Sequence, residues 1–182
     1  MQQLVVLLRG INLGSARRVA MADLRAMLDD LGYEDVRTVL QSGNAVLRSG
    51  KKPDSVARAV EKRIAKDFGL EVDAMVRTGE EIADVVSADP LAGVATDGAK
   101  SVVIFLSGEP DPAAVKSLAA EDFAPEEFRV RGRELYAWCP GGLQKSPVVK
   151  ALTERLTPPS GSATARNWNT VLKLHALLDE PR

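Results

Sequence analysis

The residues best suited to chemistry follow an apolar segment near the start of the chain. Five aliphatic residues, Leu4 to Leu8, predict a central strand that is covered on both faces. The polar loop after them contains Arg9, Gly10, Asn12, Gly14, Arg17 and Arg18. Glycines permit backbone conformations that are closed to other residues, and unpaired amides in such a turn form an anion-binding concavity. Because the arginines would add positive charge, the loop is a candidate anion site.

The formal nucleotide-binding motifs are absent from this loop. The spacing Gly10-x-Asn12-x-Gly14 lacks the glycine pattern of the dinucleotide fingerprint, and the chain has no G-x-x-x-x-G-K-[ST] segment. An ordinary strand-to-helix loop with solvated arginines therefore stays open as the alternative to an anion site.

A second polar cluster, Thr164 to Thr170, lies near the end of the chain. In it, Arg166 and Asn167 stand directly before an expected helix that starts at Trp168. An arginine beside the free amides and the positive dipole end of a helix makes an anion site. The alternative is structural: Asn167 only caps the helix, which is worth about 1 kcal/mol, and Trp168 only fills the core.

A predicted hairpin in the second half presents two aromatic rings on one face. Its register places Phe128, Val130, Leu135 and Ala137 toward the core, and Arg129, Tyr136 and Trp138 on the opposite face. Aromatic rings and an arginine on the open face of such a sheet could stack bases, as in RNA-recognition folds. Packing against the other half of the chain is the alternative, because exposed aromatic patches usually mark contacts.

The chain offers no recognisable catalytic set. Its single histidine, His175, falls at helical spacing from Trp168 and Leu178, which predicts a packed or flanking helix residue. Its single cysteine, Cys139, excludes an intrachain disulfide and a cysteine-based zinc cluster. No metal site is expected, no carboxylate spacing selects an acid/base pair, and the catalytic residues and cofactors stay unknown.

Composition limits the partners and the location. The 182 residues carry a formal net charge of −1, which gives no global attraction to nucleic acid or to a membrane. The start, Met1-Gln2-Gln3, has no basic segment, and the apolar run after it is too short for a signal or membrane segment. We therefore expect a cytoplasmic protein without membrane association, whose oligomeric state the sequence leaves unknown.

The order of the expected elements repeats along the chain. The first half has a strand at 4–8, a helix at 21–31, hairpin strands at 36–41 and 44–48, a helix at 53–68 and a strand at 72–76. Its hairpin turn is the two residues Ser42-Gly43, which sets Gln41 opposite Asn44. The second half repeats this order with a strand at 102–106, a helix from 112, hairpin strands at 127–131 and 134–138, a helix at 147–156, a short strand at 163–165 and a final helix at 168–178.

This β-α-β-β-α-β order is the split-βαβ, or ferredoxin-like, arrangement. We therefore predict an α+β fold of two ferredoxin-like subdomains, related as a tandem structural duplication. The expected division is residues 1–90 for the first subdomain, 91–100 for a linker, and 101–182 for the second subdomain with the C-terminal helix.

Three motifs together resemble one family, the bacterial domain of unknown function 1697 family. They are Arg9-Gly10-Ile11-Asn12-Leu13-Gly14 with Met21-Ala22-Asp23-Leu24, then Gln41-Ser42-Gly43-Asn44, then Thr164-Ala165-Arg166-Asn167-Trp168-Asn169-Thr170-Val171. The resemblance spans the whole chain and implies a cytoplasmic protein of two α+β subdomains, but no established activity. Relatives often carry a second glycine and lysines after the first loop, where this chain has Ser15, Ala16, Arg17 and Arg18.

The resemblance marks polar positions, and polar residues in loops suggest a site more than a requirement of the fold. The leading hypothesis is one composite pocket for a phosphorylated small ligand or nucleic acid. Its expected ligand-binding residues are Arg9, Gly10, Asn12, Arg18, Gln41, Ser42, Asn44, Arg166, Asn167 and Asn169. The alternatives are an enzyme that acts on such a ligand by positioning and charge stabilisation, and an interaction module whose polar motifs are purely structural.

Overall fold

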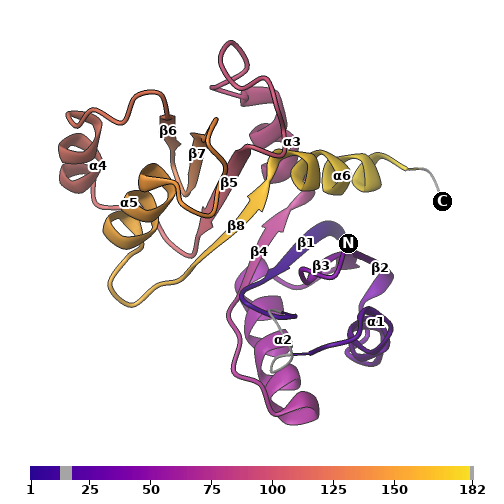
Figure 1. Ribbon diagram of the computed structural model, residues 1–182. Helices are drawn as coiled ribbons and strands as arrows, with labels where there is room; N and C mark the ends of the chain where they lie inside the picture. Colours follow the sequence, from indigo (N-terminus) through magenta and orange to yellow (C-terminus); the bar gives the residue numbers. More distant parts are fainter. Residues whose placement is uncertain (13–17, 181–182) are drawn as a thin grey trace. The chain divides into compact units, whose positions relative to one another are not determined.

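The computed structural model describes residues 1–12 and 18–180 and divides the chain into two compact units (Figure 1). Unit 1 comprises Met1–Asp84 with Leu174–Arg182, and unit 2 comprises Val85–Lys173. Gly14 and Arg17 of the predicted basic loop lie outside the described residues.

Unit 1 is built around its first strand. Its elements are β1 (Gln2–Leu8), α1 (Met21–Asp30), β2 (Glu34–Val39), β3 (Asn44–Ser49), α2 (Pro53–Phe68), β4 (Ala74–Thr78) and the start of α3 (Gly79–Ala88). The four strands form an antiparallel sheet in the order β2-β3-β1-β4, so β1 is central, as its run of aliphatic residues predicts. Leu4, Val6 and Leu8 pack into a core with the apolar residues of α1 and α2, which cover one face of the sheet.

Unit 2 repeats this arrangement. Its elements are the end of α3, β5 (Ser101–Leu106), α4 (Pro112–Ala119), β6 (Glu127–Arg131), β7 (Glu134–Trp138), α5 (Pro147–Leu156), β8 (Ala163–Asn167) and the start of α6 (Trp168–Asp179). The antiparallel order is β6-β7-β5-β8, with α4 and α5 on one face (Figure 1). The predicted fold class, α+β with two split-βαβ subdomains, is confirmed.

The first hairpin differs from its prediction. The strands end at Val39 and begin again at Asn44, so four residues connect them and Val39, not Gln41, lies opposite Asn44. The prediction of a two-residue turn was wrong. The chain leaves the strand at Leu40, which adopts a positive φ of 58°, and a bulky side chain rarely does so. The second hairpin has the predicted two-residue turn, with Arg131 opposite Glu134.

Helix ends follow their local signals. Thr78 and Glu81 form a capping box at the start of α3: Glu81 N donates to Thr78 Oγ1 (3.1 Å), and Thr78 N donates to Glu81 Oε2 (2.7 Å). Ser146 caps α5 through Val149 N (3.0 Å), and Gly69 ends α2 in the left-handed conformation. These caps fix where α3 and α5 begin and where α2 ends.

The division into units differs from the predicted boundaries. The prediction placed a linker at 91–100 and the whole last helix in the second subdomain, whereas the units meet within α3, after Asp84, and within α6, after Lys173. A side chain of β1 holds the end of α6, because Gln3 Nε2 donates to Leu178 O (2.8 Å). The longest described helix, α2, has 16 residues, and none in the described chain has the length and apolar character of a membrane span.

Candidate functional site

Two loops of unit 1 that carry predicted site residues are joined by hydrogen bonds. The loop after β1 meets the β2–β3 connection where Leu8 N donates to Gly43 O (2.8 Å) and Asn12 Nδ2 donates to Gln41 O (2.7 Å). We call these segments, residues 9–12 with 18–19 and residues 40–43, the loop pair. The two motifs are therefore neighbours in space, although Asn12 and Gln41 are 29 positions apart in the sequence.

The backbone of the loop pair is unusual. Four of the nine described residues with positive φ lie in it: Gly10 (66°), Asn12 (55°), Leu40 (58°) and Gly43 (78°). For Leu40 this conformation costs on the order of 1–2 kcal/mol, because its Cβ crowds the following carbonyl. Strained backbone persists only where the surroundings enforce it, and it clusters at functional sites. The strain makes the loop pair the first candidate for a site.

Asn12 holds the loop pair closed. Besides the bond to Gln41, its Nδ2 donates to Val19 O (2.9 Å) and its Oδ1 accepts from Val19 N (2.8 Å). These three bonds use both amide protons and one oxygen lone pair. Asn12 therefore shapes the loop in this structure, and direct contact between its amide protons and a ligand stays a prediction.

Gly43 and Asn44 fix the turn of the second loop. A Cβ at Gly43 would lie 2.6 Å from Ile11 Cδ1 and 2.9 Å from Leu8 Cβ, so no larger residue fits. The fully buried Asn44 donates through Nδ2 to Val39 O (2.8 Å) and to Ser42 Oγ (2.9 Å). This motif is thereby explained as a turn whose side chains support its own backbone.

Four polar side chains of the loop pair face solvent: Arg9, Arg18, Gln41 and Ser42. Arg9 is held from the side, since its Nη1 lies 3.1 Å from Asp73 Oδ2 in an ion pair whose two side chains are about half exposed. A pocket of about 780 Å³ adjoins it, lined by Arg9, Gly10, Glu61, Lys62, Ala65, Glu71, Val72 and Asp73. The pocket carries both signs of charge, so its lining is less suited to an anion than the exposed side chains of Arg18, Gln41 and Ser42.

The unit 2 signature residues occupy a strand end and a helix start. Arg166 was expected in a loop before the last helix, but β8 continues through Asn167 and α6 begins at Trp168. The side chain of Arg166 is only 7% exposed, and its Nη1 donates to Thr164 Oγ1 and Ala165 O (both 2.8 Å). Burial lowers the pKa of Arg166 to about 10.

Asn167 and Asn169 have structural contacts. Asn167 Oδ1 accepts from Thr170 N (2.9 Å), which confirms the predicted cap of α6. Asn169 lies on the exposed side of the first turn, and a Cβ at Gly98 would overlap its side-chain oxygen. The segment before β5 therefore packs closely on Asn169, and a larger residue at position 98 would displace this side chain.

Sequence reasoning missed one charged residue of unit 1, Arg77. It is 1% exposed, lies opposite Val5, and donates from Nη1 to Val76 O (3.2 Å). It is the counterpart of Arg166, which lies opposite Val103 in the same position of the second sheet. The signal was present as an arginine inside an apolar strand, since charged residues are almost never buried without a compensating role.

The aromatic pair of the second hairpin lies on the predicted face. Leu135 and Ala137 belong to the core with α4 and α5, whereas Tyr136 (3% exposed) and Trp138 (9%) lie on the opposite face. Both rings are thus largely withdrawn from solvent, which favours packing over the stacking of bases.

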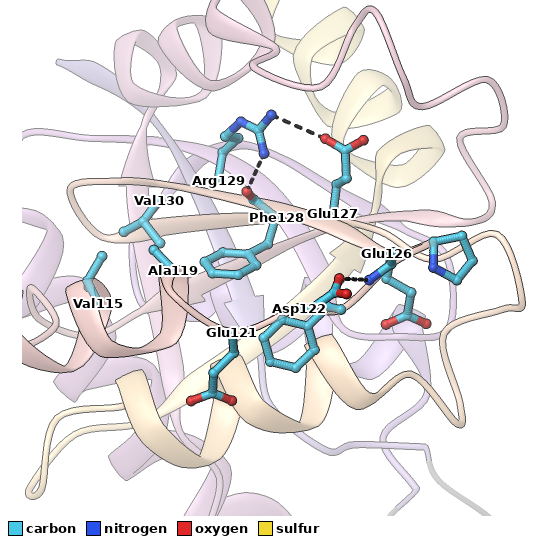
Figure 2. A pocket seen from close by; sticks show the side chains of 12 residues that line it. Val115, Ala119, Glu121, Asp122, Glu126, Glu127, Phe128, Arg129 and Val130 are labelled. Atoms are coloured by element: carbon cyan, nitrogen blue, oxygen red, sulfur yellow. Dashed lines mark hydrogen bonds and ion pairs between the residues drawn. The ribbon is translucent and has the colours of Figure 1, made fainter.

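A pocket of about 510 Å³ opens in unit 2 between α4 and β6 (Figure 2). Phe123 and Phe128 form an edge-to-face pair beside it, with ring centroids 6.0 Å apart. Its polar lining is mostly acidic, with Glu121, Asp122, Glu126 and Glu127, and its one arginine, Arg129, is paired to Glu127 at 3.2 Å. Such a pocket disfavours an anion, so the predicted chemistry does not belong here.

No group of three or more histidine, cysteine or acidic side chains in the described chain is placed to hold a metal ion. His175 faces Asp179 on α6 at 3.7 Å, as a flanking helix residue. The predicted ligand-binding residues thus form two groups: those of the loop pair with Asn44 in unit 1, and Arg166, Asn167 and Asn169 in unit 2. Their convergence on one site stays a prediction.

Comparisons with known proteins extend these findings. A family model described as "Protein of unknown function (DUF1697)" matches residues 1–136. A solved structure, that of the conserved bacterial protein SP0830 from Streptococcus pneumoniae, is similar over 99% of each chain, with a TM-score of 0.77 and 21% sequence identity. At this identity the likeness shows the fold alone. No curated protein matches the chain.

Proposed function

The chain belongs to the family of proteins of unknown function called DUF1697, as its motifs predicted, and we propose that it binds a phosphorylated small molecule at the loop pair of unit 1. One observation carries the proposal. Asn12 bonds two loops to each other, the second of which holds Leu40 at a costly positive φ, while Arg9, Arg18, Gln41 and Ser42 face solvent. A backbone that is costly to hold at Leu40, and that presents four polar side chains beside the partly exposed Leu40, is better explained by a ligand than by folding.

The exposed groups match the chemistry of a phosphate ester. Arginine offers five donors in a planar fork that pairs with phosphate oxygens, and its bonds to them are charge-assisted. The hydroxyl of Ser42 and the amide of Gln41 both donate and accept, which suits the neutral part of a metabolite. Gly10, at a φ of 66°, lets the backbone come close to the bound group.

The ion pair of Arg9 with Asp73 is compatible with this role. Exposed pairs contribute 0 to about 1 kcal/mol, so the pair orients Arg9 without consuming its binding capacity. One donor of the guanidinium reaches Asp73, and the others stay available to a ligand.

The decisive experiment is a thermal-shift screen of the full chain with nucleotides, phosphorylated sugars and short oligonucleotides. A ligand that binds only the folded protein raises its stability by RT ln(1 + [L]/Kd). The double variant Arg9→Ala with Arg18→Ala should lose this shift, whereas Arg129→Ala with Arg131→Ala, which removes two exposed arginines of unit 2, should keep it. A shift that the first double variant retains would refute the loop-pair site.

An additional arm, Arg166→Ala, tests the unit 2 signature. A reduced shift would support the larger composite site, and an unchanged shift would restrict binding to unit 1. Nucleic acid is separated from a small molecule by salt, because phosphate contacts release counterions and the affinity for a polyanion then falls steeply with added salt.

A structural role for the motifs is the second candidate. It is supported by Asn12 and Asn44, whose amides bond the protein's own backbone. In that case no compound of the screen would stabilise the chain. A bacterial origin, a cytoplasmic location and a tandem duplication, all inferred from the sequence, are part of this proposal.

A further inference from the structure

A second pocket of unit 1 lies at the other end of β1, along the edge strand β2. It has a volume of about 500 Å³ and is lined by Gln3, Asp35, Val36, Arg37, Val46, Leu47, Arg48 and Glu180. None of these residues belongs to the loop pair. Arg37 is three residues from Leu40 and Val46 is three residues from Gly43, and a strand rises 3.3 Å per residue, so the two sites are about 10 Å apart along the hairpin.

The first observation in this pocket is an unsatisfied donor. Arg48 Nε is buried, and among the described residues it has no hydrogen-bond partner. Asp35 forms a loose ion pair with Arg48, but its Oδ2 lies 3.9 Å from that nitrogen, which is too long for a hydrogen bond. Buried donors are nearly always paired, so the unpaired Arg48 Nε indicates that an acceptor from outside the described residues belongs here.

The second observation is the backbone that forms the pocket. Glu34 pairs with Arg48 and Arg37 pairs with Val46, so a bulge inserts one extra residue into β2. Asp35, inside the bulge, has a φ of 53°. Bulges redirect side chains and are frequent beside binding sites, and here the bulge holds Asp35 and Arg37 around one opening.

The third observation is a carboxylate that already occupies part of the pocket. Arg37 Nη1 lies 3.0 Å from Glu180 Oε2, and Arg37 Nη2 donates to Leu177 O near the end of α6. The Glu180 side chain is 58% exposed, so the protein's own carboxylate stands where a free carboxylate would bind an arginine. An exposed pair of this kind is weak and is readily exchanged.

We infer that this pocket binds a small carboxylate between Arg37 and Arg48, in competition with Glu180. The charges of the lining favour a ligand with one negative charge. Arg37 and Arg48 balance Asp35 and Glu180, so the lining has a charge of +1 once Glu180 is displaced. Arg48 lines the pocket and its side chain is 32% exposed, so an incoming carboxylate reaches its guanidinium, and a rotation of this side chain brings the buried Nε to one oxygen of a bidentate pair. A phosphate dianion would overcompensate that charge, so it should bind more weakly than a carboxylate.

The test is isothermal titration of the full chain with acetate and, separately, with inorganic phosphate at equal ionic strength. Arg48→Gln should weaken acetate binding about tenfold or more, the loss expected for a charge-assisted bond. Glu180→Gln should strengthen it, because the internal competitor is gone. Arg58→Gln, which removes an equal charge from the exposed side of α2, should leave it unchanged.

Two further variants keep the result unambiguous. Arg48→Lys retains the charge but lacks the Nε donor, so it should also weaken binding if that donor matters. Arg9→Gln changes only the loop pair and should leave acetate affinity as in the wild type. The inference is overturned if acetate does not bind, if Glu180→Gln does not raise its affinity, or if Arg48→Lys and Arg58→Gln behave alike.

Discussion

The two hairpins occupy the same place in the two units and are built differently. In unit 2 the strands β6 and β7 are joined by Gly132-Arg133, and a Cβ at Gly132 would have no neighbour within 4 Å. In unit 1 four residues join β2 and β3, with Leu40 and Gly43 at positive φ and Gly43 pressed against Ile11. Since one topology permits the simple turn, the strained turn of unit 1 is not a requirement of the fold.

The backbone frame around the hairpins is otherwise the same. Leu8 N donates to Gly43 O (2.8 Å), and its counterpart Leu106 N donates to Arg133 O (2.9 Å). The next amides repeat this equivalence: Arg9 N donates to Asp73 O and Ser107 N to Ser162 O, both at 2.9 Å. Unit 1 thus has Arg9 at the position where unit 2 has Ser107. At this position the two units differ in their side chains, while their backbone hydrogen bonds are the same.

The largest expected effect separates the two turn glycines. Gly43→Ala should lower the free energy of unfolding by about 3 kcal/mol, because its Cβ overlaps Ile11 and Leu8 and its φ is left-handed. Gly132→Ala should cost about 1 kcal/mol, from its φ of 56° alone. Urea unfolding of both variants measures the difference, and equal losses would remove the contrast between the hairpins.

The next effect concerns the residue that joins the loops. Asn12→Gly keeps the left-handed backbone favourable but deletes three hydrogen bonds, and it should cost about 2 kcal/mol. Asn167→Gly at the start of α6 is the matched change in unit 2 and should cost a few tenths of a kcal/mol, as capping substitutions by glycine do. If denaturation gives the two variants similar stabilities, Asn12 does not hold the loop pair.

A smaller effect with the opposite sign is expected at Leu40. This side chain is 46% exposed, so Leu40→Gly loses little packing while it relieves the positive φ, and it should raise stability by about 1 kcal/mol. Leu40→Ala, which keeps the strain, serves as control in the same thermal scans. A loss of stability in Leu40→Gly would mean that Leu40 packs rather than stores strain.

The smallest effect is a pH dependence in unit 2. Burial raises the pKa of Cys139, whose thiol donates to Ser146 Oγ at 3.2 Å. The unfolded thiol ionises first as pH rises, so the stability contributed by this group is complete below pH 9.0, the ordinary value, and is lost above it.

Unfolding curves between pH 8 and pH 10 measure this loss, with Cys139→Ala as the reference that should show a shallower decline. The same burial should protect the thiol from alkylation until the chain unfolds. Rapid labelling of the native protein would show that Cys139 is accessible.

The sequence predicted the features that depend on residues close together in the chain. The run Leu4 to Leu8 identified a central strand, and alternation along the second hairpin separated the core-facing Leu135 and Ala137 from Tyr136 and Trp138. The cap of α6 by Asn167 was equally predictable, because a cap needs only residues within one turn of the helix.

What escaped prediction depends on distant contacts or on exceptions to residue preference. Leu40 at positive φ contradicts its own propensity, and the close approach of Gly43 to Ile11 joins segments that are distant in the sequence. Arg166 looked like a loop residue because it is polar. The end of α6 joins unit 1 through Gln3 and Leu178, which are 175 positions apart in the chain.

The central claim is that the loop pair of unit 1, and not the equivalent hairpin of unit 2, binds phosphate groups. Titration of ¹⁵N-labelled full-length protein with pyrophosphate, followed by amide chemical shifts, tests it most directly. The account predicts concentration-dependent shifts of the amides of Gly10, Asn12, Ser42 and Gly43, with Gly132 unmoved. Shifts at Gly132 that equal those of Gly43, or none in the loop pair at saturating pyrophosphate, would contradict it.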